Sequence, residues 1–289
     1  MKNIIKLLRP HQYIKNGFVF IGPLFGHQWS LLVLTQATLT FLAFCFMASA
    51  VYVLNDIIDI NADQKHPVKC FRPLASGKVS LPLAKLLLAT LIVASVMTAY
   101  SVNFLIILFV AAYFLMNVLY SWKLKHIVIL DVFIISAGFM LRILTGTVGL
   151  GIAPSAWLLL CGLMVTLFLG FSKRRAELLV LKNCNANSVL TRKVLDDYSP
   201  ILLEQFIGIT AACTILSFGL YTVSPQTIAL HGTDNLIYTL PFVIYGVFRY
   251  IFLLHHKAKG NDTSKDLITD WHLLIAVASW LLTTIWILL

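Results

Sequence analysis

Long apolar segments separated by short polar stretches recur along the whole chain of 289 residues. A helix needs about 20 predominantly apolar residues to cross a bilayer. The pattern predicts nine such helices, over residues 17–34, 37–54, 83–100, 104–119, 127–144, 156–171, 201–223, 236–254 and 273–289. The first segment is interrupted by a proline, a glycine and two polar residues between positions 23 and 28. A re-entrant segment, which leaves eight crossings, is therefore the alternative there.

Composition supports the same class of protein. Hydrophobic residues make up 59% of the chain and charged residues 12%, against roughly 25% charged residues in soluble domains. This predicts an all-α, polytopic membrane helix bundle. No low-complexity linker or repeat divides the chain, so residues 1–289 are expected to form a single membrane domain. The five cysteines show no CxxC spacing, which indicates neither a disulfide framework nor a zinc site.

Lysine and arginine gather in alternate connections, and only Arg142 lies outside them. The positive-inside rule then places the N-terminus and the basic loops in the cytoplasm. These loops are expected at about 60–82, 120–127, 172–199 and 255–271. The net charge of +10 is explained by this topology and by attraction to anionic membrane lipids, so no nucleic-acid partner is expected.

An acidic motif, NDIIDINAD, follows the second apolar segment. Asp56, Asp59 and Asp63 are spaced by three and four residues, so a continuous helix would place them on one face. Ionised groups that close repel one another, and they are costly to desolvate at a membrane boundary. A divalent cation between them resolves both problems, and oxygen ligands favour Mg²⁺. Because Mg²⁺ commonly completes its shell with substrate phosphates, the motif predicts an enzyme that acts on a diphosphate.

The next residues are basic. Lys65, Lys69, Arg72 and Lys78 lie within fifteen residues of Asp63, and His66 sits inside the same motif. Cations beside a metal site are suited to clamping phosphate. The alternative is a solvated loop that carries the cytoplasmic positive charge.

These motifs carry a family resemblance. NDxxDxxxD, followed by HPxK and RPLASG, resembles the first signature of the UbiA-type intramembrane prenyltransferase superfamily. The resemblance implies about nine helices around a central cavity open to the cytoplasmic side, and a polyprenyl diphosphate bound through Mg²⁺. Segments 9–25, 120–142 and 171–178 and the C-terminal region resemble one branch in particular, the decaprenyl-phosphate phosphoribosyltransferase-like proteins.

One departure from the superfamily pattern supports that branch. Ordinary members resemble one another in a second Asp-rich motif after the sixth helix, whereas this chain has Lys173, Arg174 and Arg175 there. Guanidinium groups pair bidentately with phosphate oxygens, which suits a reaction with more phosphate to hold. Phosphoribosyl diphosphate with a lipid phosphate is such a case. The alternative is that these residues only anchor the sixth helix at the cytoplasmic surface.

A second polar set includes Tyr120, Lys125 and Asp131. Asp131 lies inside an apolar run, where a carboxylate needs a partner, a cavity or a metal. It could complete the metal site, orient a ribose hydroxyl or pair with a lysine. Arg142 is eleven residues further on, about 16 Å along a helix, and a structural or lipid-facing role is expected for it.

The expected activity is Mg²⁺-dependent transfer of a 5-phosphoribosyl group from phosphoribosyl diphosphate to a polyprenyl phosphate in the bacterial inner membrane. Alternatives are transfer of a polyprenyl group to an aromatic acceptor and, third, transport without catalysis. Assembly into a homo-oligomer is an open possibility. The expected catalytic metal ligands are Asp56, Asp59 and Asp63, and the expected substrate contacts are Lys15, Asn55, Lys65, His66, Lys69, Arg72, Tyr120, Lys125, Asp131, Lys173 and Arg174.

Overall fold

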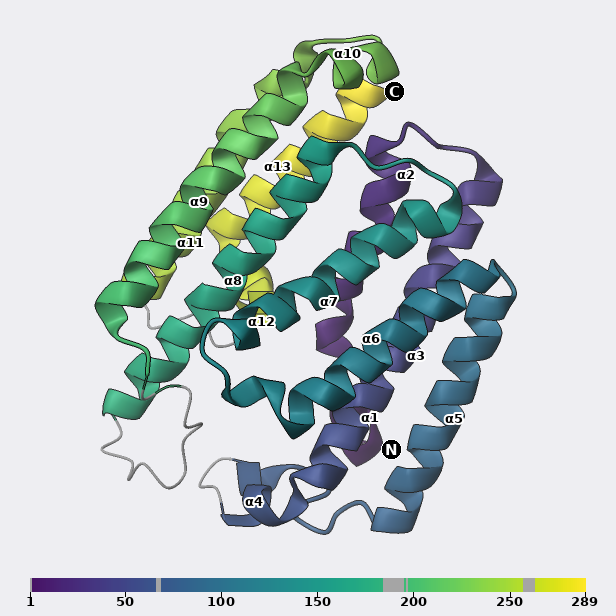
Figure 1. The fold of residues 1–289 in the computed structure, drawn as a ribbon, viewed down its shortest axis with the longest axis vertical. Helices are drawn as coiled ribbons and strands as arrows, with labels where there is room; N and C mark the ends of the chain where they lie inside the picture. Colours follow the sequence, from purple (N-terminus) through teal and green to yellow (C-terminus); the bar gives the residue numbers. More distant parts are fainter. Residues whose placement is uncertain (1, 66–68, 184–194, 196, 257–262) are drawn as a thin grey trace. The chain divides into compact units, whose positions relative to one another are not determined.

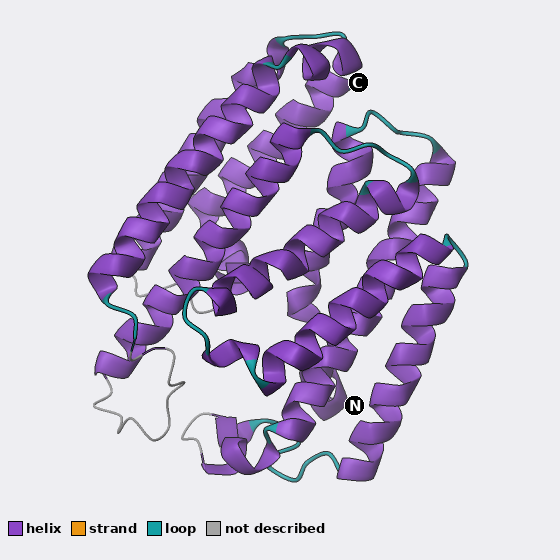
Figure 2. Cartoon of the chain, in the orientation of Figure 1, coloured by secondary structure: helices purple, strands orange, loops and turns teal. Residues whose placement is uncertain are grey.

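Helices account for the regular structure of the chain. The computed structural model describes residues 2–65, 69–183, 195, 197–256 and 263–289, and this part of the chain contains no strand (Figure 2). The α-helices are α1 (Lys2–Leu8), α2 (Ile21–Phe25), α3 (Leu31–Ile58), α4 (Ile60–Lys65), α5 (Leu81–Tyr100), α6 (Phe104–Trp122), α7 (Leu130–Gly146), α8 (Ala156–Asn183), α9 (Pro200–Val223), α10 (Pro225–His231), α11 (Leu240–His256), α12 (Thr263–Thr269) and α13 (Trp271–Leu288). The 3₁₀ helices are η1 (Pro10–Phe20), η2 (Lys69–Phe71), η3 (Leu124–His126), η4 (Val148–Leu150) and η7 (Asn235–Thr239).

Contacts group the chain into two compact units. Unit 1 comprises Met1–Pro23, Trp29–Leu124 and Leu141–Ile152, and unit 2 comprises Leu24–Gln28, Lys125–Met140 and Ala153–Leu289. Helix α7 contributes its first part to unit 2 and its last part to unit 1.

Unit 1 is built around α3. Helices α5 and α6 pack against α3 and against each other, and α1 and η1 also lie along α3 (Figure 1). Phe44, Met47 and Val51 of α3 enter a core that also includes Ile106 and Val110 of α6. The last part of α3, where the acidic motif begins, packs against α4, and α4 packs against η2.

In unit 2, α8 packs against α9, and α11 packs against α9 and α13 (Figure 1). Its core includes Leu167 and Phe168 of α8, Leu203 and Ile207 of α9 and Leu253 of α11. Side-chain caps begin several of its helices: at α9, for example, Ser199 accepts a hydrogen bond from the Leu202 amide, and at α13 Asp270 accepts one from the Leu273 amide.

Eight helices in the described part of the chain are long and apolar enough to cross a membrane. Seven of the predicted segments correspond to α5, α6, α7, α8, α9, α11 with η7, and α13, and the segment predicted at 37–54 lies within α3. The segment predicted at 17–34 is not one helix. The end of η1 and the short α2 occupy its first half, and α3 begins only after the Ser30 side chain accepts a hydrogen bond from Val33. The break falls at the glycine and polar residues that interrupt the apolar pattern.

Candidate functional site

The acidic motif spans two helices and not one. Helix α3 ends at Ile58, Asp59 caps it, and α4 starts at Ile60. The expected single helical face is therefore interrupted at Asp59. The chain nevertheless continues in helical register, because the Asp63 amide donates to the Asp59 carbonyl at 2.8 Å.

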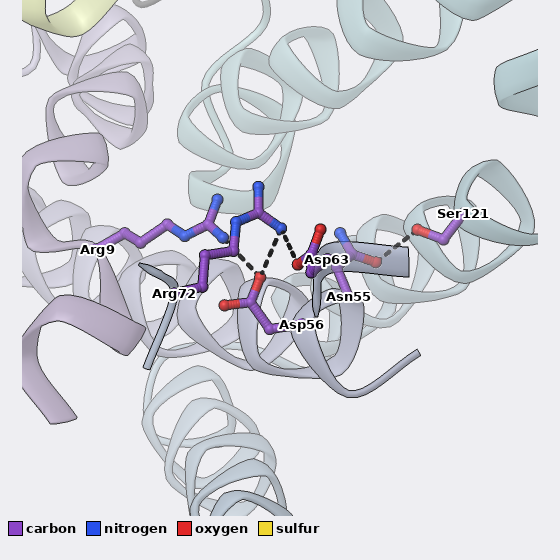
Figure 3. A network of polar contacts seen from close by, with 6 residues as sticks. All are labelled: Arg9, Asn55, Asp56, Asp63, Arg72 and Ser121. Atoms are coloured by element: carbon purple, nitrogen blue, oxygen red, sulfur yellow. Dashed lines mark hydrogen bonds and ion pairs between the residues drawn. The ribbon is translucent and has the colours of Figure 1, made fainter. Parts of the chain in front are cut away.

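Asp56 and Asp63 meet at one arginine. Nη1 of Arg72 lies 2.6 Å from Asp63 Oδ2 and 3.2 Å from Asp56 Oδ1 (Figure 3). Nη2 of Arg9 contacts the same Asp56 oxygen at 2.6 Å. The two aspartates are only 2% and 3% exposed, so the arginines supply the positive charge that buried carboxylates require. The sequence predicted Arg72 at the site but did not predict Arg9.

Arg9 occupies an unusual backbone position. It directly follows α1, its amide donates to the Ile5 carbonyl at 3.2 Å, and its φ of 53° lies in the left-handed region. Glycine is favoured at such a helix end because a Cβ atom makes the conformation costly. Glycine, however, could not reach Asp56, and the Arg9 guanidinium also lies 4.9 Å from the ring centroid of Tyr52. The only sequence signal was its place at the start of the 9–25 segment.

The first residue of the motif has a structural partner. Oδ1 of Asn55 accepts a hydrogen bond of 2.6 Å from the Ser121 hydroxyl, which connects α3 to the end of α6 (Figure 3). Ser121 was not predicted, because nothing in the local pattern of α6 distinguishes it. The bond holds the α3 turn from which Asp56 projects.

The donor set at this site suits Mg²⁺. This ion is usually bound by one or two carboxylates, with water and phosphate oxygens completing its shell. Asp56 and Asp63 match that requirement because they already converge on one cationic nitrogen of Arg72. Among the residues that the structure describes, no three His, Cys, Asp or Glu side chains gather closely enough to hold a metal by themselves. The site therefore fits a metal ion whose remaining ligands are water and substrate phosphate oxygens.

The other residues predicted in unit 1 occupy several elements. Lys15 on η1, Lys69 on η2 and Tyr120 on α6 are partly buried, each with polar or electrostatic contacts. Lys65 is the last residue of α4, but its side chain lies outside the described part. His66 lies wholly outside the described residues.

In unit 2, Asp131 and Arg174 form a fully buried ion pair. Arg174 Nε lies 2.6 Å from Asp131 Oδ2, and both side chains are 0% exposed. Arg174 also pairs with Glu177, one helical turn along α8. Of the roles considered for Asp131, pairing with a cation is the one that the structure contains, and the cation is an arginine rather than a lysine.

Tyr198 completes this network and was not predicted. Its hydroxyl donates to Asp131 Oδ1 at 2.9 Å and accepts from the Ile129 amide at 2.7 Å. Burial, and secondly the Asp131 charge, raise the pKa of Tyr198, so the hydroxyl remains a proton donor. Ile129 has a φ of 67°, which is a strained conformation for a β-branched residue.

The basic segment after the sixth predicted helix is helical and belongs to α8, whereas a loop was expected to begin at residue 172. Lys173 is partly buried and has contacts. Arg175 is paired with Glu204 at 2.9 Å and donates to the Leu254 carbonyl at 3.1 Å. Lys125, on η3, is also partly buried with contacts.

Arg142 does not face lipid. It is 6% exposed, and Nε donates to Oδ1 of Asn16 at 2.7 Å within unit 1. The lipid-facing role considered from the sequence is therefore wrong, and the structural role is supported. Asn16 is itself fully buried.

Comparison with known proteins agrees with the fold and the motifs. A sequence model of the UbiA prenyltransferase family matches residues 17–275. The decaprenyl-phosphate phosphoribosyltransferase of Corynebacterium glutamicum is 32% identical over 269 residues, which are 90% of this chain and 77% of the relative. The protein of the same name from Mycolicibacterium smegmatis is 33% identical over 229 residues, which are 78% of this chain and 71% of the relative.

Solved structures show the same fold. A UbiA homolog from Archaeoglobus fulgidus, bound to GPP and Mg²⁺, aligns with a TM-score of 0.73 over 99% of both chains at 17% sequence identity. At that identity the likeness concerns the fold alone. The family match, however, covers most of the chain, and relatives more than 30% identical accompany it. The chain therefore belongs to the UbiA prenyltransferase family.

Proposed function

We propose that this membrane transferase moves a 5-phosphoribosyl group from phosphoribosyl diphosphate to a polyprenyl phosphate, releasing diphosphate. The product is a polyprenyl-phosphoryl-5-phosphoribose. The observation that carries the proposal is the 32% identity, over 90% of the chain, to a relative named decaprenyl-phosphate phosphoribosyltransferase. The reaction is assigned to the cytoplasmic side of a bacterial inner membrane, where the basic connections are expected.

The acidic site supplies the anchor for the sugar donor. Asp56 and Asp63, with Asp59 beside them, would hold Mg²⁺, which when bound supplies charge for the diphosphate leaving group. Arg72 and Arg9 neutralise the negative charge of the aspartates in the structure. The Arg72–Asp63 and Arg9–Asp56 contacts are both 2.6 Å long. The same guanidinium groups can hold phosphate oxygens bidentately when the substrate binds.

Further cations are proposed to neutralise the remaining phosphates. In unit 1 these are Lys15, Lys65 and Lys69, with His66, Asn55 and Tyr120 as polar contacts. In unit 2, Lys125 and Lys173 are the candidates for direct contact. Arg174 and Asp131 are fully buried in their own ion pair, so we assign them to shaping the start of α7 and the middle of α8.

The lipid phosphate acts as the nucleophile. Its oxygen is ionised at neutral pH, so it attacks the anomeric carbon without a general base, and the bond to diphosphate breaks. Positive character develops on the sugar while the leaving group gains charge. The residues of the site accelerate the reaction by positioning both phosphates and by stabilising that charge.

The test is incubation of the purified protein with Mg²⁺, labelled phosphoribosyl diphosphate and a polyprenyl phosphate, followed by organic extraction. Label should enter the lipid phase, and EDTA should prevent this. Asp56→Asn should lower the rate by at least about a hundredfold, because it removes a buried charge at the leaving group. Asp234→Asn, at an exposed position of unit 2, is the matched control and should retain the rate.

Two outcomes would contradict the proposal. One is an absence of lipid label with an intact wild-type protein. The other is consumption of a polyprenyl diphosphate together with an aromatic acceptor, which would assign the chain to the ordinary prenyltransferases of the same family.

A further inference from the structure

A buried arginine lies on the last part of α7, far along the sequence from the acidic motif. Besides its bond to Asn16, Arg142 donates through Nη2 to the Tyr113 hydroxyl at 3.0 Å. Its guanidinium carbon lies 4.6 Å from the Tyr113 ring centroid and 5.6 Å from that of Phe44. A charge inside a spanning segment is costly, so a residue retained there usually has a specific task.

Asn16 links Arg142 of α7 to α3. Its Oδ1 accepts from Arg142 Nε, and its Nδ2 donates to Sγ of Cys45 at 3.2 Å. Both ends of one buried amide are therefore used, one towards α7 and one towards α3. Asn16 is the point at which the N-terminal segment, residues 8–16, is held from two sides.

The contact with α3 continues along the segment. Ser49 donates to the Leu8 carbonyl at 2.9 Å and is 2.7 Å from the Tyr13 hydroxyl. Beyond it, Tyr52 and Asp56 contact Arg9. The four α3 residues Cys45, Ser49, Tyr52 and Asp56 are spaced by four, three and four, which places them on one helical face. A shift of one residue between the N-terminal segment and α3 would disrupt these contacts.

A close backbone approach on the other side supports the same docking. A Cβ atom on Gly146 of α7 would lie 1.9 Å from the Val19 carbonyl oxygen, and one on Gly22 would lie 1.7 Å from the Gly146 oxygen. Arg142 and Gly146 are one helical turn apart on α7. The backbone at Val19 and Gly22 is therefore in close contact with the end of α7.

We propose that Arg142 is a positioning residue: by holding Asn16 it sets the register of the N-terminal segment on α3 and so brings Arg9 onto Asp56. Arg142 acts through Asn16 and the segment, not on substrate. Its consequence for catalysis rests on the proposed function, whereas its effect on the segment and on the acidic site does not.

Hydrogen–deuterium exchange of the full-length protein in detergent tests the docking directly. Arg142→Gln and Asn16→Ala should each raise amide exchange in residues 10–20 by roughly ten- to a hundredfold, the equivalent of one charged hydrogen bond. The double variant should exceed neither single variant by much, because both changes break the same link. Arg142→Lys, which keeps the charge and one donor group, should restore part of the protection.

Arg249→Gln is the matched control. Arg249 is also an arginine of a spanning helix, bound to both oxygens of Asp270 at 3.0 Å, but it belongs to unit 2. Its loss should leave exchange in residues 10–20 unchanged.

Mn²⁺ binding, measured by electron paramagnetic resonance without substrate, distinguishes positioning from general stability. Arg9 occupies an Asp56 oxygen that a metal ligated by Asp56 would use, so loosening Arg9 should tighten Mn²⁺ binding. We expect a Kd lowered by at least about threefold in Arg142→Gln and Asn16→Ala, but not in Arg249→Gln. Arg9→Gln should shift the Kd in the same direction.

The outcomes separate the two proposals. Unchanged exchange in residues 10–20, equal loosening throughout unit 1, or an unchanged Mn²⁺ Kd would overturn the role of Arg142. If Arg142→Gln does not fold, Asn16→Ala decides by the same criteria. Absence of phosphoribosyl transfer in the wild type would overturn only the function, because neither measurement uses a substrate.

Discussion

Arginine is the partner of several buried carboxylates in the described part of the chain. Arg72 joins Asp56 to Asp63, and Arg174 pairs with Asp131. A guanidinium presents several donors in one plane, so it can satisfy two acceptors at once where a lysine ammonium would act as a point charge. Each pair brings its own desolvation cost, which is why removing only one partner is more damaging than the net strength of the pair suggests.

Tyr198 offers a sharp test at this scale. Tyr198→Phe removes one hydroxyl and leaves both an Asp131 oxygen and the Ile129 amide without that partner. The free energy of unfolding should fall by about 1–3 kcal/mol, as expected when buried polar groups lose a hydrogen bond. Unfolding in detergent by increasing SDS would measure it. Tyr100→Phe, at a residue 74% exposed, is the control and should change little.

The stability difference between wild type and Tyr198→Phe should also depend on pH. Because the pKa of Tyr198 is raised in the folded protein, its contribution to stability is complete below the unfolded value of about 10. It is lost as the pH rises beyond that value, since the unfolded tyrosine ionises first. The stability difference between wild type and Tyr198→Phe should therefore narrow above about pH 10. A difference that widens there would contradict the assignment of the hydroxyl as a donor.

At the scale of elements, α7 has close polar or backbone contacts near both of its ends. Its first turn carries Asp131, in unit 2, and its last turns carry Arg142 and Gly146, in unit 1. The N-terminal segment, residues 8–16, overlaps the 3₁₀ helix η1 over Pro10–Phe20, which is longer than the three or four residues usual for that geometry. Such a helix has poorer hydrogen bonds of its own, so contacts with α3 and α7 are needed to hold it.

Gly146→Ala should break this packing. The new Cβ would meet the Val19 backbone, which cannot move aside as a flexible side chain would. A loss of about 3 kcal/mol or more is expected, at the upper end for overpacking, and thermal unfolding of the purified protein would report it. Gly208→Ala on α9 is the matched change, because nothing lies within 4 Å of its Cβ position. Equal effects of the two substitutions would refute the close approach.

For the whole molecule, the distribution of charge predicts the orientation in the membrane. Residues Lys78 and Asp234 are both exposed and lie in connections of opposite charge character. In a background without native cysteines, Lys78→Cys should react with an impermeant maleimide only in inverted vesicles. Asp234→Cys should react only in right-side-out vesicles, because the positive-inside rule places these connections on opposite sides. The reverse pattern would place the acidic site outside the cell.

Much of the fold was predictable because its signals are local. Eight of the nine expected spans correspond to observed helices. An apolar run of sufficient length predicts a spanning helix without any knowledge of its neighbours. The segment at 17–34 was wrong as a single helix, because the chain breaks between α2 and α3 at the glycine and polar residues that interrupt the apolar run. The end of α3 at Asp59 and the extension of α8 to Asn183 were also missed. Helix ends depend on caps and neighbours more than on hydropathy.

In the candidate site, too, the residues that lie close together in the sequence were predicted and the distant ones were not. Asp56, Asp63 and Arg72 were predicted because their spacing in one short stretch already implies proximity. Three other residues were not predicted, because each is far along the chain from the acceptor that it contacts. The separations are 47 residues for Arg9, 66 for Ser121 and 67 for Tyr198. Arg142 was recognised only as a charge in an apolar run, and its partner Asn16 is 126 residues away.

The sequence by itself determined the membrane class, the family and the acidic motif, because hydropathy, periodicity and short-range spacing are properties of a linear chain. The tertiary structure alone decided which cation meets which carboxylate and how the N-terminal segment is held on α3. Those pairings follow from burial, where each polar group must find a partner among whatever residues the packing brings near. For partners that lie far apart in the sequence, such as Arg9 and Asp56, their separation along the chain carries no information about that choice.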